Sequence, residues 1–263
     1  MLTEQQSEQL LQETLTASIE SFDDIASTND HAIMRSKQWE AELPLLVLAA
    51  NQTAGRGRGA NQWWASAGAL TFSILFSRRH LSATQQAAPM TSLAIGVAVC
   101  DAVAAIDSTI NARLKWPNDV FVNGKKLAGI LIECPSAAVG DVVVGVGINV
   151  NNSVRQAPED VAARAISLTD LLDRPCDSFA VLLHTLHQIE HQLTQMQADP
   201  QRVIQRCQEL CVLTGRQVSL TIGERSVAGK CHGIAESGGL LIQSGHEVVE
   251  WSAGHVEVLP PVH

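Results

Sequence analysis

A glycine- and arginine-rich segment between two apolar stretches has the composition of an anion-binding loop. It reads Gly55-Arg56-Gly57-Arg58-Gly59. Glycine lets backbone N–H groups approach a phosphate closely, and arginine adds a planar, permanently charged group that matches phosphate or carboxylate. The segment lacks the lysine of the loop that commonly binds nucleoside triphosphates. A dinucleotide-binding fingerprint would require a helix directly after the glycines, and none is expected here. Two interpretations stay open: a clamp for an anion, or a surface loop with two solvated arginines.

The two like charges predict that this loop is mobile when empty and becomes ordered when an anion neutralises it. A loop of that kind can act as a lid that keeps water away from a reactive intermediate. Trp63 and Trp64 follow it. They either pack over the ring system of a ligand or anchor the loop to the core.

A second segment places polar side chains at a corner between two short strands. It reads Lys115-Trp116-Pro117-Asn118-Asp119, and Lys126 follows after a predicted hairpin. Asn118 and Asp119 can point into a pocket from such a corner. Lys126 would be held at the sheet edge, where an ammonium group can neutralise a carboxylate or phosphate. The alternative is that these lysines have no function beyond solvation, because lysines often flank hairpins and Lys125 is expected to be solvated.

Two further segments suit contact with a ligand. The apolar run 142–151 contains Gly145 and Gly147, and glycine within a strand often marks the close approach of a ligand or another backbone. Asn149 supplies amide contacts there or, alternatively, forms a turn. Ser27-Thr28-Asn29 precedes an amphipathic stretch, and a helix N-cap would explain its small hydroxyl groups without any ligand.

Histidines and cysteines do not indicate a metal site. His184, His187 and His191 form a row at helical spacing, which we interpret as a partly solvated helix face. The six cysteines include no Cys-x-x-Cys pair and are expected to be reduced, structural thiols of a cytosolic protein. We therefore predict no metal ligands from the protein.

The elements that must position these segments indicate an α+β fold. Strands are predicted at 44–50, 70–76, 110–115, 120–122, 126–133 and 142–150, with a type I′ hairpin at Asn123-Gly124. Helices are predicted at 4–20, 89–107, 178–197 and 200–213. Beyond Gly215, short strands alternate with glycine turns at 217–222, 225–234, 240–243, 247–251 and 255–259, which suits a small barrel. The boundary near Thr214 divides the chain into domains at 1–213 and 214–263.

Composition narrows the functional class. The chain has 263 residues, 46% of them hydrophobic, which is enough for a substantial core. Its net charge of −9 argues against binding of duplex DNA. The N-terminus is polar, and no apolar run is expected to be long enough to span a bilayer, so we predict a cytoplasmic protein with no membrane partner.

The four segments, in this order, resemble the biotin protein ligase family. The motifs GRGR, KWPND, KLAGIL and GVGINVN extend from Ser27 to Asn151, and the distal strands are similar to the SH3-like barrel that ends many bacterial members. The resemblance implies a mixed sheet flanked by helices, as in class II aminoacyl-tRNA synthetases. It also implies a two-step reaction in which biotin and ATP, with Mg²⁺, give biotinyl-5′-AMP and pyrophosphate. A lysine of the biotin carboxyl carrier protein of acetyl-CoA carboxylase then takes the biotinyl group and releases AMP.

The same resemblance implies roles for individual residues. Arg58, Lys126 and Asp119 would be catalytic, with Arg56 and Arg58 on the phosphate and carboxylate. The binding set would comprise Ser27, Thr28, Asn29, Gln52, Gly55, Arg56, Gly57, Trp63, Asn118, Gly129, Ile130, Gly147 and Asn149. Within it, Ser27, Thr28 and Gln52 would bind the ureido ring, Gly129 and Ile130 would form the floor, and Trp63, Asn118 and Asn149 would lie on the nucleotide side.

Two departures from the family pattern carry expectations. Gly59 stands where many relatives have a further arginine, which predicts weaker retention of the adenylate. Only about 20 residues precede Phe22, too few for a helix-turn-helix domain, so we predict a monofunctional enzyme without a DNA-binding role. Relatives often pair through their central sheets, which is consistent with a homodimer. The alternatives are a lipoate or octanoyl ligase or transferase of the related fold, and a non-catalytic biotin or nucleotide sensor.

Overall fold

Two β-sheets and the helices packed against them make up the part of the chain that the structure describes. The computed structural model describes residues 2–38, 42–77, 81, 88–135 and 140–260. The first sheet has seven strands in the order β1-β2-β3-β7-β6-β5-β4, with β1 parallel to β2 and every other pair antiparallel. Its strands are β1 (Ser18–Ile25), β2 (Leu45–Gln52), β3 (Leu70–Phe76), β4 (Arg113–Lys115), β5 (Asp119–Val122), β6 (Lys125–Glu133) and β7 (Val142–Ile148).

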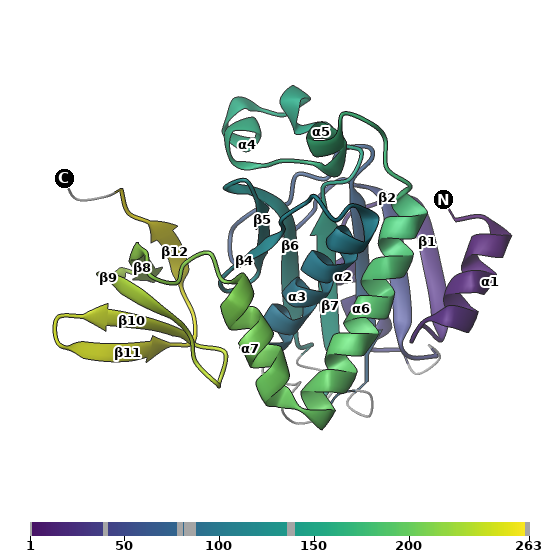
Figure 1. The fold of residues 1–263 in the computed structure, drawn as a ribbon. Coiled ribbons are helices and arrows are strands. Elements are labelled where there is room, and N and C mark those ends of the chain that lie inside the picture. The colour runs from purple at the N-terminus through teal and green to yellow at the C-terminus, as the bar shows by residue number, and fades with distance from the viewer. Residues whose placement is uncertain (1, 39–41, 78–80, 82–87, 136–139, 261–263) are drawn as a thin grey trace.

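Helices cover both faces of this sheet (Figure 1). They are α1 (Glu4–Glu13), α2 (Thr28–Arg35), α3 (Ala88–Ile106), α4 (Glu159–Arg164), α5 (Leu168–Leu172), α6 (Ser178–Ala198) and α7 (Pro200–Leu210). Alternate residues of β2 point to opposite faces, so Leu46 joins the main core with α3 and α6, while Val47 packs with Ala32 of α2. The face that α2 covers is the one on which the polar segments gather.

Helix α3 departs from one expectation. Its segment Pro89–Ile106 is long and apolar enough to cross a bilayer by length and composition, so the expectation that no such run exists is wrong. That segment is 72% buried within the protein, against the sheet and α6. Its apolar character is therefore explained by its place in the core.

Other predicted elements are corrected near the N-terminus and after β7. The helix predicted over 4–20 ends at Glu13, and 18–25 instead forms the edge strand β1. Pairing with β2 prevails there over the helical spacing of the apolar residues. The short helices α4 and α5 were not predicted, because each is shorter than two full turns of apolar periodicity. The Asn123-Gly124 turn is confirmed, with φ of 51° and 77°.

The second sheet is antiparallel and lies beside the β4 edge of the first (Figure 1). Its order is β11-β10-β9-β8-β12, and its strands are β8 (Gln217–Ile222), β9 (Arg225–Ile234), β10 (Leu240–Ser244), β11 (Glu247–Trp251) and β12 (His255–Val258). Trp116, which is 1% exposed, donates from Nε1 to the carbonyl of Gly238 at 3.0 Å and so ties the two sheets together. The α+β class predicted from the sequence is confirmed.

Candidate active site

One cavity of about 860 Å³ collects the polar segments on the α2 face of the first sheet. Its far wall comes from the second sheet, through the β8–β9 turn and the start of β12. The predicted residues that line it are Ser27, Thr28, Asn29, Gln52, Arg56, Gly57, Arg58, Trp63, Asn118, Asp119, Lys126, Gly129, Ile130, Gly147 and Asn149. Gly55 does not line it. A Cβ there would lie 2.8 Å from the carbonyl oxygen of Trp63, so Gly55 shapes the loop instead.

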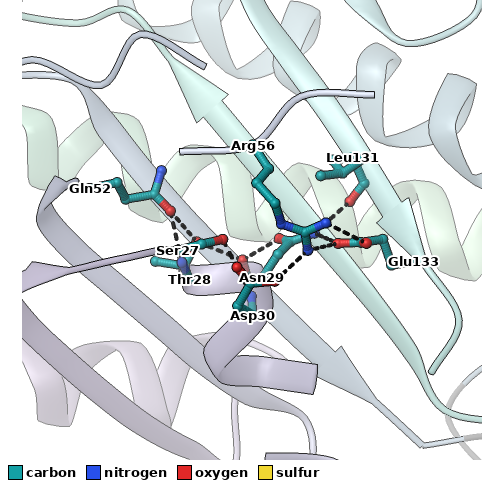
Figure 2. Close-up of polar contacts among 9 residues, drawn as sticks. Ser27, Thr28, Asn29, Asp30, Gln52, Arg56, Leu131 and Glu133 are labelled. Carbon is teal, nitrogen blue, oxygen red and sulfur yellow. Dashed lines mark hydrogen bonds and ion pairs between the residues drawn. The ribbon is translucent and has the colours of Figure 1, made fainter. Parts of the chain in front are cut away.

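The start of α2 forms one polar end of the cavity (Figure 2). Ser27 caps the helix by accepting from the amide of Asp30 at 3.3 Å, which confirms the predicted N-cap. Thr28 donates from its backbone amide and its hydroxyl to Gln52 Oε1, at 2.7 and 3.1 Å. Capping therefore explains Ser27 alone, while Thr28 and Gln52 form a separate hydrogen-bonded pair at the wall of the cavity.

Asn29 sits in a pre-formed seat beside this pair. Its Nδ2 donates to Glu133 Oε2 at 2.9 Å and to the Leu131 carbonyl at 3.3 Å (Figure 2). Ser73 donates to Asn29 Oδ1 at 2.6 Å. A Cβ at Gly145 would lie 2.8 Å from Asn29 Cγ and closer still to Oδ1, so the glycine makes room for this side chain. The predicted close approach at Gly145 is thus an approach by Asn29.

Ser73, Asp30 and Glu133 are parts of this network that sequence reasoning missed. Ser73 is fully buried on β3. A signal for it exists, because Thr71 and Ser73 alternate within an otherwise apolar strand, which marks a polar contact on one face. The two carboxylates have no such signal, since their partner is far away along the chain.

That partner is Arg56, which both carboxylates neutralise. Its guanidinium contacts Glu133 through two hydrogen bonds, at 2.9 and 2.6 Å, and lies 2.7 Å from Asp30 Oδ1. The hydrogen bonds that Arg56 donates to Glu133 raise the pKa of Arg56, against the effect of burial. Figure 2 shows the guanidinium lying between the two carboxylates, across the seat of Asn29. Arg56 therefore closes this end of the cavity, and the two carboxylates fix the position of its guanidinium group.

Arg58 points to the other sheet. Its Nη1 donates to the carbonyl of Gly254 at 3.1 Å, in the loop that precedes β12. Within the loop, the amide of Gly57 donates to the carbonyl of Asn61 at 2.8 Å, and Gly59 adopts a φ of 67°. The loop thus forms a tight turn over the cavity, and its predicted mobility stays a prediction.

Lys126 and Asp119 form a close ion pair on the cavity floor. Lys126 Nζ lies 2.6 Å from Asp119 Oδ1, an oxygen that is buried and has no hydrogen-bond donor among the described residues. The contact is thus an ion pair without the alignment of a hydrogen bond. A Cβ at Gly129 would lie 3.0 Å from Lys126 Nζ, so this glycine lets the lysine lie flat on the sheet.

Trp63 covers Gly147 on the neighbouring strand. A Cβ at that glycine would lie 2.5 Å from Trp63 Cε2, and Lys126 Nζ is 5.8 Å from the indole ring. Trp63 Nε1 is buried without a hydrogen-bond partner among the described residues. Both interpretations of this residue fit, since the ring anchors the loop to the sheet and also lines the cavity.

The side-chain amides of Asn118 and Asn149 donate hydrogen bonds to backbone carbonyls. Asn118 Nδ2 donates to the Ile130 carbonyl at 2.7 Å, and Asn149 Nδ2 donates to the Ile166 carbonyl at 3.2 Å. Asn149 is 3% exposed and accepts at Oδ1 from Asn152 at 2.9 Å. Both amides hold the walls of the cavity in position, and their predicted contacts with a nucleotide stay predictions.

The described residues contain no group of three or more His, Cys, Asp or Glu side chains that could hold a metal ion. All six cysteines are unpaired. Burial raises the pKa of Cys207 to about 12 and that of Cys231 to about 11, so both remain neutral thiols.

Comparison with known proteins assigns this arrangement to a family. The model of the biotin/lipoate A/B protein ligase family matches residues 21–149. The biotin–[acetyl-CoA-carboxylase] ligase of Mycobacterium tuberculosis is 36% identical over 234 residues, which cover 88% of this chain and 85% of that protein. This chain belongs to the biotin protein ligase family. The resemblance predicted from the four segments is confirmed, and the chain is a ligase.

Two further members of the biotin protein ligase family support the assignment. The bifunctional ligase/repressor BirA of Escherichia coli is 30% identical over 241 residues, or 89% of this chain and 72% of that protein. The biotin protein ligase of Aquifex aeolicus, solved in complex with biotin and ATP, superposes with a TM-score of 0.80 at 28% identity. The match covers 92% of this chain and 99% of that one. The fold of this biotin protein ligase, with its mixed sheet and second C-terminal sheet, is thus the family's fold.

Proposed function

We propose that this ligase uses ATP to convert biotin into biotinyl-5′-AMP and then transfers biotin to a lysine of the biotin carboxyl carrier protein of acetyl-CoA carboxylase. One observation carries the proposal. A single cavity joins a buried cluster of hydroxyl and amide groups at α2 to the Lys126–Asp119 pair and to the loop between β2 and β3 that carries Arg56 and Arg58. The named substrates of the Mycobacterium and Aquifex relatives support the same chemistry.

The polar end of the cavity suits the ureido ring of biotin. Ser27, Thr28, Asn29 and Gln52 present donors and acceptors, and the first three are at most 4% exposed. Most of their hydrogen bonds are already made within the protein, but the Ser27 hydroxyl and Gln52 Nε2 donate to no other described residue and can donate to a ligand that offers acceptors. The dithiolane ring of lipoate has no N–H or C=O group to offer. This difference favours biotin over lipoate, with Gly129 and Ile130 as the floor beneath the ring.

Adenylation needs positive charge more than a covalent nucleophile. A carboxylate oxygen of biotin bonds to the α-phosphorus of ATP, and the bond to the β-phosphate oxygen breaks and releases pyrophosphate. Lys126 would neutralise charge on the reacting phosphate, and Arg58 would hold the phosphate from above once the loop closes. Trp63, Asn118 and Asn149 would bound the nucleotide side of the cavity.

Magnesium fits this site as an ion that arrives with ATP. Asp119 offers a carboxylate at the cavity, whose Oδ1 already lies 2.6 Å from Lys126 Nζ, and Mg²⁺ commonly uses one or two carboxylates together with substrate phosphates. When bound, the ion would neutralise phosphate charge.

In the transfer step, the amine of the carrier lysine attacks the carbonyl of the mixed anhydride and AMP leaves. Asp119, whose carboxylate faces the cavity, would align that amine.

We further propose that residues 1–213 carry the chemistry and that residues 214–263 close the cavity. The hydrogen bond from Arg58 to Gly254 and the wall formed by the second sheet support this division. Pairing of two chains through the first sheet remains part of the proposal. It is tested separately by sedimentation with and without biotin and ATP.

The exchange of labelled pyrophosphate into ATP tests the proposed reaction. We expect exchange that depends on biotin, followed by biotinylation of a purified carrier domain detected by mass spectrometry. Lipoate supplied in place of biotin should give no exchange. Exchange that requires lipoate, or no exchange with either acid, would overturn the proposal.

A further inference from the structure

The cations that line the cavity differ in whether a carboxylate already neutralises them. They are Arg56, Arg58, Lys115, Lys126 and Arg164. Three are paired: Arg56 with Asp30 and Glu133, Lys126 with Asp119, and Arg164 with Asp160. Among the described residues, Arg58 and Lys115 have no carboxylate within ion-pair distance. Arg58 donates to the carbonyl of Gly254, whereas Lys115 has neither a close counter-ion nor a hydrogen bond from its ammonium group to another described residue.

Lys115 stands in one row with the ion pair on the cavity floor. It lies directly opposite Asp119 across the β4–β5 pair, and Asp119 in turn lies opposite Gly129, over which the Lys126 head rests. Side chains directly opposite in an antiparallel pair lie on the same face, with Cβ atoms about 5 Å apart. Lys115 and Lys126 thus flank one carboxylate, that of Asp119, and Lys126 is the lysine that forms an ion pair with it. The row carries a net positive charge that faces the cavity.

The surroundings of Lys115 favour an anion at this position. Its Nζ lies 5.1 Å from the ring centroid of Phe121, and the side chain is half-buried. Burial lowers the pKa of Lys115, against the opposing effects of Asp119 and Glu257. A partly desolvated ammonium group without a paired carboxylate is costly, and a bound anion would offset that cost.

We propose that Lys115 binds the β- and γ-phosphates of ATP and stabilises the departing pyrophosphate. This assignment rests on the proposed function. The strand order β3-β7-β6-β5-β4 places Lys115 beyond Lys126 from the polar cluster that takes the ring of biotin. With the reacting phosphate beside Lys126, the adenosine that remains is uncharged, whereas the pyrophosphate is strongly anionic. When the bond between the α-phosphorus and the bridging oxygen breaks, its electron pair leaves with pyrophosphate, and Lys115 neutralises that charge without any proton transfer.

The assignment predicts that only the first half-reaction needs Lys115. In Lys115→Gln, the KM for inorganic pyrophosphate in biotin-dependent exchange should rise by about tenfold or more, because a hydrogen bond to a charged group is lost. Transfer of biotin from separately prepared biotinyl-5′-AMP to a carrier domain should proceed at the wild-type rate. Lys115→Arg should retain most of the pyrophosphate affinity. Lys230→Gln is the matched control, because it removes the same charge from an exposed position outside the cavity.

Calorimetric titration of each variant with inorganic pyrophosphate gives a readout that does not depend on turnover. An unchanged KM and an unchanged pyrophosphate affinity in Lys115→Gln would overturn the assignment and leave the proposed function intact. Equal losses in both half-reactions would also overturn it, since they would indicate a merely structural lysine. Absence of biotin-dependent exchange in the wild-type chain would instead overturn the proposed function, and the assignment with it.

Discussion

Asn29 occupies the space that Gly145 leaves open on β7. The seat is built before any ligand arrives, because Ser73, Glu133 and the Leu131 carbonyl already fix both ends of the Asn29 amide. Pre-organisation of this kind lowers the entropy that binding must overcome. The polar end of the cavity is therefore organised before a ligand binds.

Gly145→Ala should weaken biotin binding. The added methyl group would meet Asn29 Cγ at 2.8 Å and would push the amide away from Ser73 and Glu133. We expect a rise of about tenfold or more in the KM for biotin, and a loss of about 1–3 kcal/mol in the free energy of unfolding. Pyrophosphate exchange and urea titration measure the two effects.

The double variant Gly145→Ala with Asn29→Ala is the control for that change. If the glycine acts through Asn29, the two substitutions should be strongly non-additive. Additive effects on the KM would show that the glycine serves some other purpose.

Lys126→Gln should slow adenylation by well over tenfold while leaving the fold intact. The lysine is 34% exposed and its partner Asp119 is 23% exposed, so the pair contributes little to stability, on the order of 1 kcal/mol or less. The rate of pyrophosphate exchange and the melting temperature measure the two quantities. A large fall in melting temperature together with activity would assign the pair to folding instead.

Trp116→Phe should loosen the contact between the two sheets. The substitution leaves the carbonyl of Gly238 without its donor, at an expected cost of about 1–3 kcal/mol in the free energy of unfolding. Trp251→Phe is a suitable comparison, because the Nε1 of Trp251 has no hydrogen-bond partner among the described residues. Equal destabilisation by both changes would contradict the role given to the Trp116 hydrogen bond.

Asp170 should make stability depend on pH in the acid range. Burial acts to raise its pKa, but hydrogen bonds from Ser167, Ser153 and the amide of Val154 outweigh burial and lower it. A lowered pKa in the folded state means that the carboxylate stabilises the protein at neutral pH. That contribution is lost as the pH falls from about 4 through the lowered value.

Asp170→Asn should therefore destabilise the protein most at neutral pH, and the difference from the wild type should shrink below about pH 4. Unfolding in urea at several pH values measures this difference. Asp173→Asn is the control, since the Asp173 side chain is 80% exposed. A difference that stays constant with pH would rule out the carboxylate as its source.

Local signals in the sequence were enough to predict much of the fold. The Ser27 cap, the Asn123-Gly124 turn and the short strands after Gly215 depend on neighbouring residues, and each was predicted. The helix predicted over 4–20 ran into β1, and residues 21–25 received no element, because the pairing of this strand with β2 involves a distant segment. Only the folded chain reveals such a pairing.

The same distinction applies to the candidate site. All the residues placed in the site from the sequence except Gly55 line the cavity. Asp30 and Glu133, which neutralise Arg56, were missed because Arg56 meets them only through the fold. Lys115 lay within a motif that had been recognised. The motif alone does not distinguish Lys115 from the neighbouring cations, which are already paired with carboxylates in the structure.

Three glycines on two adjacent strands each receive one side chain of the cavity: Gly145 receives Asn29, Gly147 receives Trp63, and Gly129 receives Lys126. Gly129 and Gly147 face each other directly across β6 and β7. The missing Cβ atoms leave three depressions in the surface of the sheet, and the side chains that fill them come from α2, the loop between β2 and β3, and β6. An engineer seeking new acyl substrates could exchange Asn29 and Trp63, keep Lys126 for the chemistry and leave the strands untouched.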